Sequence, residues 1–266
     1  MNYVKIGIAF ALLVTLTACA TVPVTGRRSL SLVSDSELAS MSLTAYRKIL
    51  DESELSTDPE QLELVRRVGW RIADATEQYL LQHGYSIEGY EWEFNVLKDD
   101  ETVNAWAMPG GKVAVYTGLL PLTQDDAGLA TVLGHEVAHI LAGHGNERMS
   151  QSMVVGMGGA VLSVVLGEAS GMGSKALLSS YGAATQVGVL LPFSRKHESE
   201  ADRIGLTLMA IAGYDPRAAI PFWTRMNEQG GDRPPTFLAT HPAPANRIEA
   251  IRSYLPEALA VYGSGD

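Results

Sequence analysis

The feature that most constrains this chain is a pair of histidines four residues apart in an apolar run, Thr131-Val132-Leu133-Gly134-His135-Glu136-Val137-Ala138-His139-Ile140-Leu141. Its large apolar residues recur at helical spacing, which predicts a buried helix. Four residues turn a helix through about 400°, so His135 and His139 leave one face, as two ligands of one zinc ion would. Glu136 flanks that face and can act as a general base. The alternative is a core helix whose histidines are hydrogen-bonded.

The third ligand distinguishes the kinds of zinc helix. A metzincin needs a glycine seven residues after the first histidine and a third histidine ten after it, but these positions hold Ala142 and Gly145. His144 is turned away from the metal face and is interpreted as structural, or at most as a residue that supports a metal ligand. The stretch Met157-Gly158-Gly159, about twenty residues after the second histidine, carries no acid. The single cysteine, Cys19, lies outside this region, so histidine and glutamate remain as ligands.

A better source of the third ligand is the stretch from Arg195 to Gly205, which holds Glu198 and Asp202. If this stretch is helical, the two carboxylates share a face. One can bind zinc and the other can accept an imidazole N–H. The alternative is a charged, solvated helix start. The apolar residues from Ile204 onward favour a helix that soon becomes buried.

Two further blocks accompany these motifs: Asn104-Ala105-Trp106-Ala107-Met108-Pro109-Gly110-Gly111 upstream, and His241-Pro242 with Arg247 near the end. In this order, from about residue 100 to 250, the blocks resemble the M48-family zinc metallopeptidases. That family includes the CAAX-prenyl endopeptidases and bacterial periplasmic members.

The resemblance implies one zinc ion per chain, bound by His135, His139 and Glu198. It makes Glu136 the catalytic base, and it places Asp202 and Arg247 beside the ligands, with Asp202 orienting a histidine. His241 matches a histidine that steadies the oxyanion or caps the metal in a resting state; the alternative is an ordinary loop histidine.

The resemblance also implies a zinc-dependent endopeptidase that acts on polypeptides, as a predominantly helical α+β, zincin-like domain with a small antiparallel sheet beside the active-site helix. The residue pattern predicts helices at about 34–50, from Asp58-Pro59, from about 124, at the Glu198 block, after Asp215-Pro216 and at about 244–254. It predicts a strand at 92–96 and a hairpin of 102–108 with 112–116. The edge formed by Asn104, Ala105, Trp106, Ala107 and Met108 is the candidate substrate-binding strand. The alternative is a hairpin that merely completes the sheet.

The first residues resemble a bacterial lipoprotein signal. Ile6 to Ala18 form an apolar stretch too short to span a bilayer comfortably, and it ends in Leu16-Thr17-Ala18-Cys19. We therefore expect a signal peptide at 1–18, a lipid on Cys19, a tether at 19–33 and a single peptidase domain at 34–266. Ala20 favours sorting to the outer membrane, which predicts a periplasmic protein on its inner leaflet. The alternative is ordinary signal cleavage with an incidental thiol.

The composition and the glycine-rich segment at 149–191 bear on the partners of the protein and on alternative functions. The formal charge of −10 argues against nucleic acid as a partner. Residues 149–191 are apolar runs broken by glycines, which predict a helical lid, a homo-oligomer interface or a membrane contact. The same segment supports an alternative function, a chaperone-like binding protein on a zincin scaffold. A non-peptidase zinc hydrolase is a third reading, and it requires a small closed pocket.

Overall fold

The computed structural model describes residues 19–166, 191–229, 235–242 and 246–263, with side chains left out of the description at 157–166 and 191–194. The chain divides into two compact units. The first draws on Met1–Ser34 and Gly143–Phe193, and the second on Asp35–Ala142 and Ser194–Asp266. Among the described residues, no helix is both long and apolar enough to cross a membrane. The predicted signal peptide at 1–18 lies outside the described residues.

The sheet of the second unit has three strands in the order β3 (Glu93–Leu97), β5 (Lys112–Tyr116) and β4 (Ala105–Met108). β4 and β5 are antiparallel and joined by a tight turn in which Gly110 and Gly111 have φ of 84° and 79°, values that favour glycine. The predicted hairpin is therefore confirmed. β3 pairs with β5 in parallel, so the sheet is mixed and not purely antiparallel. β4 is left at an edge.

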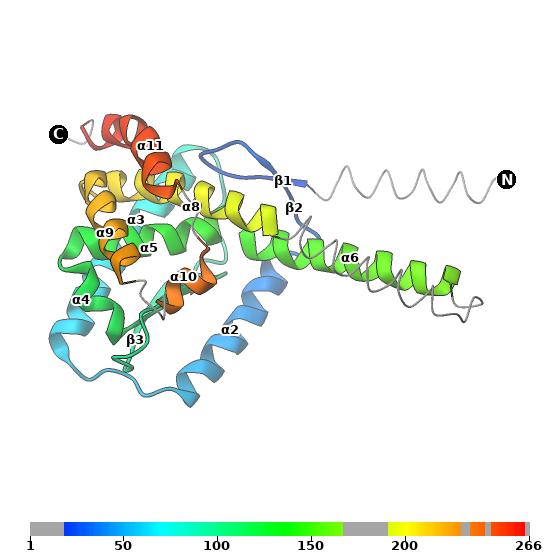
Figure 1. Cartoon of the computed structure of the whole chain (residues 1–266), viewed down its shortest axis with the longest axis horizontal. Helices are drawn as coiled ribbons and strands as arrows, with labels where there is room; N and C mark the ends of the chain where they lie inside the picture. The colour runs from blue at the N-terminus through cyan, green and yellow to red at the C-terminus, as the bar shows by residue number, and fades with distance from the viewer. Residues whose placement is uncertain (1–18, 167–190, 230–234, 243–245, 264–266) are drawn as a thin grey trace. The chain divides into compact units, whose positions relative to one another are not determined.

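Helices make up the rest of this unit (Figure 1). Asp58 caps α3 by accepting from the backbone N–H groups of Glu60 and Gln61, and Asp125 caps α5 by accepting from that of Gly128. The helices are α2 (Asp35–Glu52), α3 (Pro59–Gln82), α4 (Leu120–Thr123), α5 (Asp126–Leu141), α8 (Leu191–Ile211), α9 (Ala219–Glu228), α10 (Thr236–Thr240) and α11 (Arg247–Tyr262), with the 3₁₀ turns η1 (Thr117–Leu119) and η3 (Pro216–Ala218). The predominantly helical α+β class is confirmed.

Helix α5 is the centre of the core. It packs against α3, β4 and α9, and its apolar residues from Leu129 to Val137 are buried on all sides. A helix that is apolar all round is stable only when other elements cover it completely. The histidine motif is therefore held inside the unit on a rigid element.

The first unit contains a hairpin of β1 (Cys19–Thr21) and β2 (Arg28–Leu30), together with α6 (His144–Leu166). The Arg27 guanidinium donates to both oxygens of Glu147, at 3.0 and 2.7 Å. Asn146 Nδ2 donates to the carbonyl of Val33, at 2.7 Å. The predicted tether at 19–33 thus contains a hairpin tied to α6. Of the predicted insert at 149–191, residues 167–190 lie outside the described part.

Candidate active site

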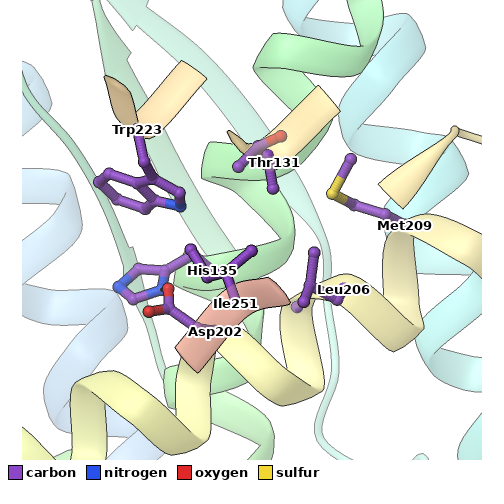
Figure 2. Close-up of a pocket in the computed structure, with 9 residues that line it drawn as sticks. Thr131, His135, Asp202, Leu206, Met209, Trp223 and Ile251 are labelled. Atoms are coloured by element: carbon purple, nitrogen blue, oxygen red, sulfur yellow. The ribbon is translucent and has the colours of Figure 1, made fainter. Parts of the chain in front are cut away.

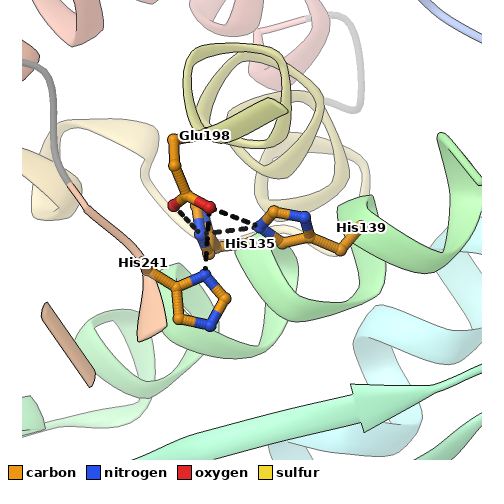
Figure 3. A group of neighbouring side chains, drawn as sticks. All are labelled: His135, His139, Glu198 and His241. Carbon is orange, nitrogen blue, oxygen red and sulfur yellow. Dashed lines mark hydrogen bonds and ion pairs between the residues drawn. The ribbon is translucent and has the colours of Figure 1, made fainter. Parts of the chain in front are cut away.

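The two histidines of α5 point the same way, as their spacing predicts. His135 Nε2 and His139 Nε2 lie 3.1 Å apart (Figure 3). His135 is 1% exposed, and the His139 side chain is 17% exposed. Two nitrogen atoms bound 2.0–2.1 Å from one tetrahedral zinc ion would lie about 3.3 Å apart. The pair therefore already has the separation of two ligands on one ion.

Glu198, from α8, completes a triangle with them. Its Oε2 is 3.2 Å from His135 Nε2, and its Oε1 is 3.5 Å from His139 Nε2. His241, just after α10, brings Nδ1 to 3.2 Å from Glu198 Oε1. One ligand atom from each of these four residues lies within 4.8 Å of the others. This donor set, three imidazoles and a carboxylate, fits zinc.

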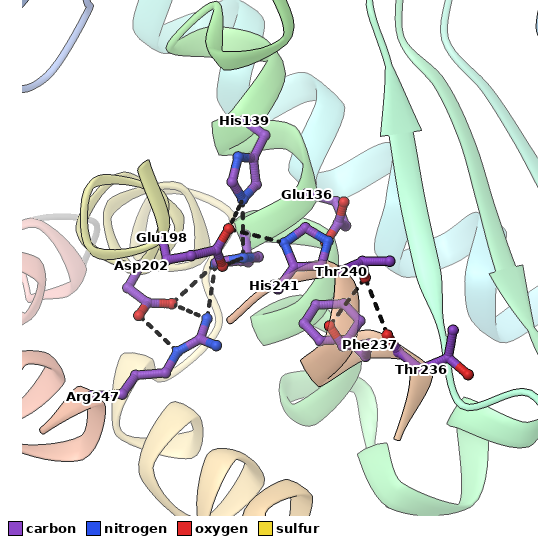
Figure 4. A network of polar contacts seen from close by, with 10 residues as sticks. Glu136, His139, Glu198, Asp202, Thr236, Phe237, Thr240, His241 and Arg247 are labelled. Carbon is purple, nitrogen blue, oxygen red and sulfur yellow. Dashed lines mark hydrogen bonds and ion pairs between the residues drawn. The ribbon is translucent and has the colours of Figure 1, made fainter. Parts of the chain in front are cut away.

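Asp202 and Arg247 fix the orientation of His135. Figure 4 shows the paired side chains of Asp202 and Arg247. His135 Nδ1 lies 3.0 Å from Asp202 Oδ1. Arg247 Nη2 is 3.3 Å from the same nitrogen, but a guanidinium can only donate, so the Nδ1–H is directed to Asp202. In the neutral ring, Nε2 then carries the lone pair that a metal needs.

Arg247 itself is held by two contacts. It donates to both carboxylate oxygens of Asp202, at 2.8 and 2.6 Å. Its guanidinium carbon lies 3.3 Å from the ring centroid of Trp223. Arg247 is 2% exposed and Asp202 is 4% exposed, so this ion pair is fully desolvated. Asp202 is therefore fixed in position by residues of α9 and α11.

For His135, Glu198 and Asp202, burial and the contacts between charged groups shift the pKa in opposite directions. Burial alone would lower the pKa of His135, but its contacts with Asp202 and Glu198 raise it to about 9. Burial would raise the pKa of Glu198, but the hydrogen bonds from His135 and His241 hold it well below its usual range. Burial likewise opposes ionisation of Asp202, but the Arg247 charge and the contacts with His135 together outweigh it and lower the pKa of Asp202. Both acids are thus anionic at neutral pH.

Glu136 is in a different environment. It is 3% exposed, and burial raises the pKa of its carboxyl group. It accepts a hydrogen bond from the backbone N–H of Ala107 in β4. Its Oε1 lies 3.4 Å from His241 Nε2. A carboxylate with a raised pKa beside a metal site suits a general base.

A small cavity lies behind His135 (Figure 2). Its volume is about 10 Å³, close to the least that can hold one water molecule. Thr131, Leu206 and Met209 line it together with His135 and Asp202. It is too small for a substrate, so a substrate must approach the cluster from elsewhere.

Comparisons with known proteins agree with this geometry. The model of peptidase family M48 matches residues 70–255. The chain belongs to peptidase family M48. That match includes the histidine helix, the Glu198 block and the segment from His241 to Arg247.

Three similar proteins come from different organisms. The chain is 35% identical over 239 residues to the mitochondrial metalloendopeptidase OMA1 of Schizosaccharomyces pombe, covering 89% of this chain and 66% of that protein. It is 29% identical over 248 residues to the human mitochondrial metalloendopeptidase OMA1, covering 90% and 46%. It is 29% identical over 238 residues to the β-barrel assembly-enhancing protease of Escherichia coli, covering 88% and 47%. The chain thus spans less than two thirds of the length of these relatives.

The structure brings together the residues that the sequence nominated as ligands, base and orienting pair: His135, Glu136, His139, Glu198, Asp202, His241 and Arg247. Of the nominated strand, Ala107 reaches the site through its main chain. Sequence reasoning missed Trp223 and Phe237, whose rings lie 5.6 and 6.0 Å from that of His135. Neither residue belongs to a metal-binding motif, so no sequence signal identified them.

Proposed function

We propose that this chain is a zinc-dependent endopeptidase. The observation that carries the proposal is the triangle of His135, His139 and Glu198 with the buried acid Glu136 beside it. Zinc, when bound, would polarise the scissile carbonyl and an attacking water. The ligands come from two helices of one rigid core, and Asp202 fixes the tautomer of His135.

Glu136 would accept the proton of the attacking water and pass it to the leaving amine. Its raised pKa favours both transfers near neutral pH. Its hydrogen bond from Ala107 N–H also fixes the carboxylate next to β4. Because β4 is an edge strand, base and substrate would meet there.

The edge of β4 supplies the substrate register. Tyr116 N–H donates to the Asn104 carbonyl, at 3.0 Å. Residues of an antiparallel strand alternate between bonding their partner and pointing away, so Ala105 and Ala107 direct their main-chain groups away from β5. An extended peptide would pair with the main-chain groups of these two residues that stay available, which excludes the Ala107 N–H bonded to Glu136, and would present its side chains on alternate faces. The neighbouring carbonyl of Val103 accepts from Phe237 N–H, at 3.0 Å, which ends the pairing on that side.

The position of His241 supports a second candidate function, in which the zinc site is closed by a fourth ligand. Catalytic zinc sites keep one position open, whereas four protein ligands close a site. His241 is close enough to be the fourth ligand, and its ring stacks on Phe237 with centroids 4.5 Å apart. In this arrangement the enzyme would be self-inhibited, and turnover would require His241 to leave. The alternative function is a chaperone-like binding protein with low proteolysis.

The test uses the full chain, purified in detergent, as wild type, Glu136→Gln and His241→Ala, with metal content and casein cleavage measured. One zinc per chain in all three, with cleavage lost only in Glu136→Gln, supports the endopeptidase. Cleavage that appears or rises only in His241→Ala supports self-inhibition. Zinc without cleavage in any form supports the binding protein. Wild-type protein without zinc refutes the metal site itself.

We also propose that the protein is a periplasmic lipoprotein of the outer membrane that degrades misfolded or envelope proteins. The lipoprotein-like end at Cys19 supports the location. The Escherichia coli relative, by its name, enhances β-barrel assembly, which supports envelope clients. The mitochondrial relatives favour a different compartment. Palmitate labelling and membrane fractionation of wild type and Cys19→Ser test this, and equal soluble fractions would refute the anchor.

A further inference from the structure

Helices α5 and α8 touch backbone to backbone where Gly134 and Gly205 meet. A Cβ atom on Gly134 would lie 2.9 Å from the Gly205 carbonyl oxygen. A Cβ atom on Gly205 would lie 2.9 Å from the His135 backbone nitrogen and 3.0 Å from the Gly134 carbonyl carbon. Real Cβ atoms essentially never come closer than 3.0 Å to such neighbours. Backbone cannot rotate away, so a side chain at either position would push the helices apart.

This crossing lies at the metal-binding residues. Gly134 directly precedes His135. Gly205 follows Asp202 by three residues and Glu198 by seven, so all three share the face of α8 that meets α5. The contacts of Glu198 and Asp202 with the histidines of α5 therefore depend on the distance between the two helices at this crossing.

The distances at stake are short. Glu198 lies 3.2 Å from His135 Nε2, and Asp202 lies 3.0 Å from His135 Nδ1. Metal–ligand distances tolerate changes of about 0.2 Å, and a functional constellation tolerates about 0.5 Å. A few tenths of an ångström of helix separation would thus be felt by the ligand set before the fold is lost.

We propose that Gly134 and Gly205 are positioning residues of the metal site, which set the distance between α5 and α8 so that Glu198 reaches an ion held by His135 and His139. The inference rests on the proposed zinc site. The competing explanation is that the two glycines serve general core packing, as glycines do at many helix contacts.

A matched control separates the two explanations. Gly69, in α3, is more crowded still, although by a side chain and not by backbone: a Cβ atom there would lie 2.5 Å from the Phe94 ring. None of the metal-binding residues is among its near contacts. Gly145, in α6, is exposed and has nothing within 4 Å of its Cβ position. Gly69→Ala therefore tests crowding without the metal site, and Gly145→Ala tests the substitution alone.

The experiment measures zinc affinity by chelator competition in the full chain, together with urea unfolding of the metal-free protein and the visible spectrum with cobalt(II). We expect Gly205→Ala to weaken zinc binding about 10- to 100-fold, the size of effect found when residues supporting metal ligands are changed. Its cobalt spectrum should also change. Gly69→Ala should lower the urea midpoint while binding zinc within about twofold of wild type. Gly145→Ala should bind zinc as wild type does, with a urea midpoint equal to or slightly above that of wild type.

Gly134→Ala provides a milder form of the same change, because one atom, not two, lies at 3.0 Å or less from its Cβ position. It should weaken zinc binding less than Gly205→Ala, and it replaces that variant if Gly205→Ala does not fold. Zinc affinity within twofold of wild type and an unchanged cobalt spectrum, in whichever variant folds, would overturn the inference. Wild-type protein that binds no zinc would instead overturn the proposed function.

Discussion

Replacing Arg247 with methionine should destabilise the metal-free protein by about 3–5 kcal/mol, the usual effect of breaking a buried ion pair. The side chains of Arg247 and Asp202 are 1% and 2% exposed. Without the guanidinium, His135 would be the one remaining partner of the desolvated Asp202 carboxylate among the residues that the structure describes. The pKa of Asp202, now held low chiefly by Arg247 against burial, should rise.

The chain offers a matched control between the same two helices. Arg203 of α8 donates to both oxygens of Glu257 in α11, at 3.0 and 3.1 Å. Those side chains are 36% and 45% exposed, so Arg203→Met should cost less than about 1 kcal/mol. The two variants remove the same kind of bidentate bond and differ mainly in burial.

The assay is urea unfolding of the metal-free full chain, followed by zinc competition. Arg247→Met should also weaken zinc binding about 10- to 100-fold, because His135 loses its fixed tautomer. The double variant Asp202→Asn with Arg247→Met should be more stable than Arg247→Met alone, since no uncompensated charge stays buried. Equal losses in Arg247→Met and Arg203→Met, with unchanged zinc affinity, would refute the reasoning.

Four further predictions concern other residues. The pKa of His135 is raised to about 9 in the metal-free protein, so zinc must displace a proton from this ring at pH 7. The affinity for zinc should therefore rise about tenfold per pH unit up to about pH 9. Calorimetry in two buffers that detects no proton release on zinc binding would contradict this. The same shift stabilises the metal-free fold below about pH 6.5, and this contribution should disappear as the pH rises through 9. Ala107→Pro should keep the sheet, since the Ala107 N–H points away from β5. It should also raise the pKa of the acid limb of kcat/KM, because the Glu136 carboxylate loses the hydrogen bond that it accepts from this N–H. Ala105→Pro is the control, and an acid limb that does not move in Ala107→Pro would argue against the role of this hydrogen bond. Arg27→Met should leave the buried Glu147 without its bidentate partner and expose 19–33 to limited proteolysis, whereas a wild-type digestion pattern would show that the hairpin is held by other contacts.

Sequence alone predicted those parts of the site that depend on local spacing. His135 and His139 are fixed by helical periodicity, and Asp58 with Pro59 marks the start of α3. The helix pattern also predicted α8, and the two strand segments on either side of Pro109-Gly110-Gly111 predicted the pairing of β4 with β5. These features need only neighbours within a few residues of chain.

Features that depend on distant contacts were not predictable. β3 joins β5 in parallel, a pairing that the alternation of Phe94 and Val96 does not specify. Trp223 lies against Arg247 only because α9 and α11 pack together. The five-residue helix α10 is too short to give a periodic signal. A single glycine in a helix, such as Gly205, is uninformative until the opposing backbone is known.

The charges of the buried groups link metal binding at this site to the ionisation of Glu136. Three buried carboxylates, Glu136, Glu198 and Asp202, lie around one buried guanidinium, that of Arg247. Without a further cation this arrangement is costly, because buried charges must be paired, and the raised pKa of His135 shows that the metal-free site recruits a proton in partial compensation. A divalent ion would bring the four groups to neutrality and would need His135 in its unprotonated form. The ion would also favour the charged form of Glu136 despite its burial, which is the form that a general base requires. Metal binding and readiness of the base are therefore a single electrostatic event in this site.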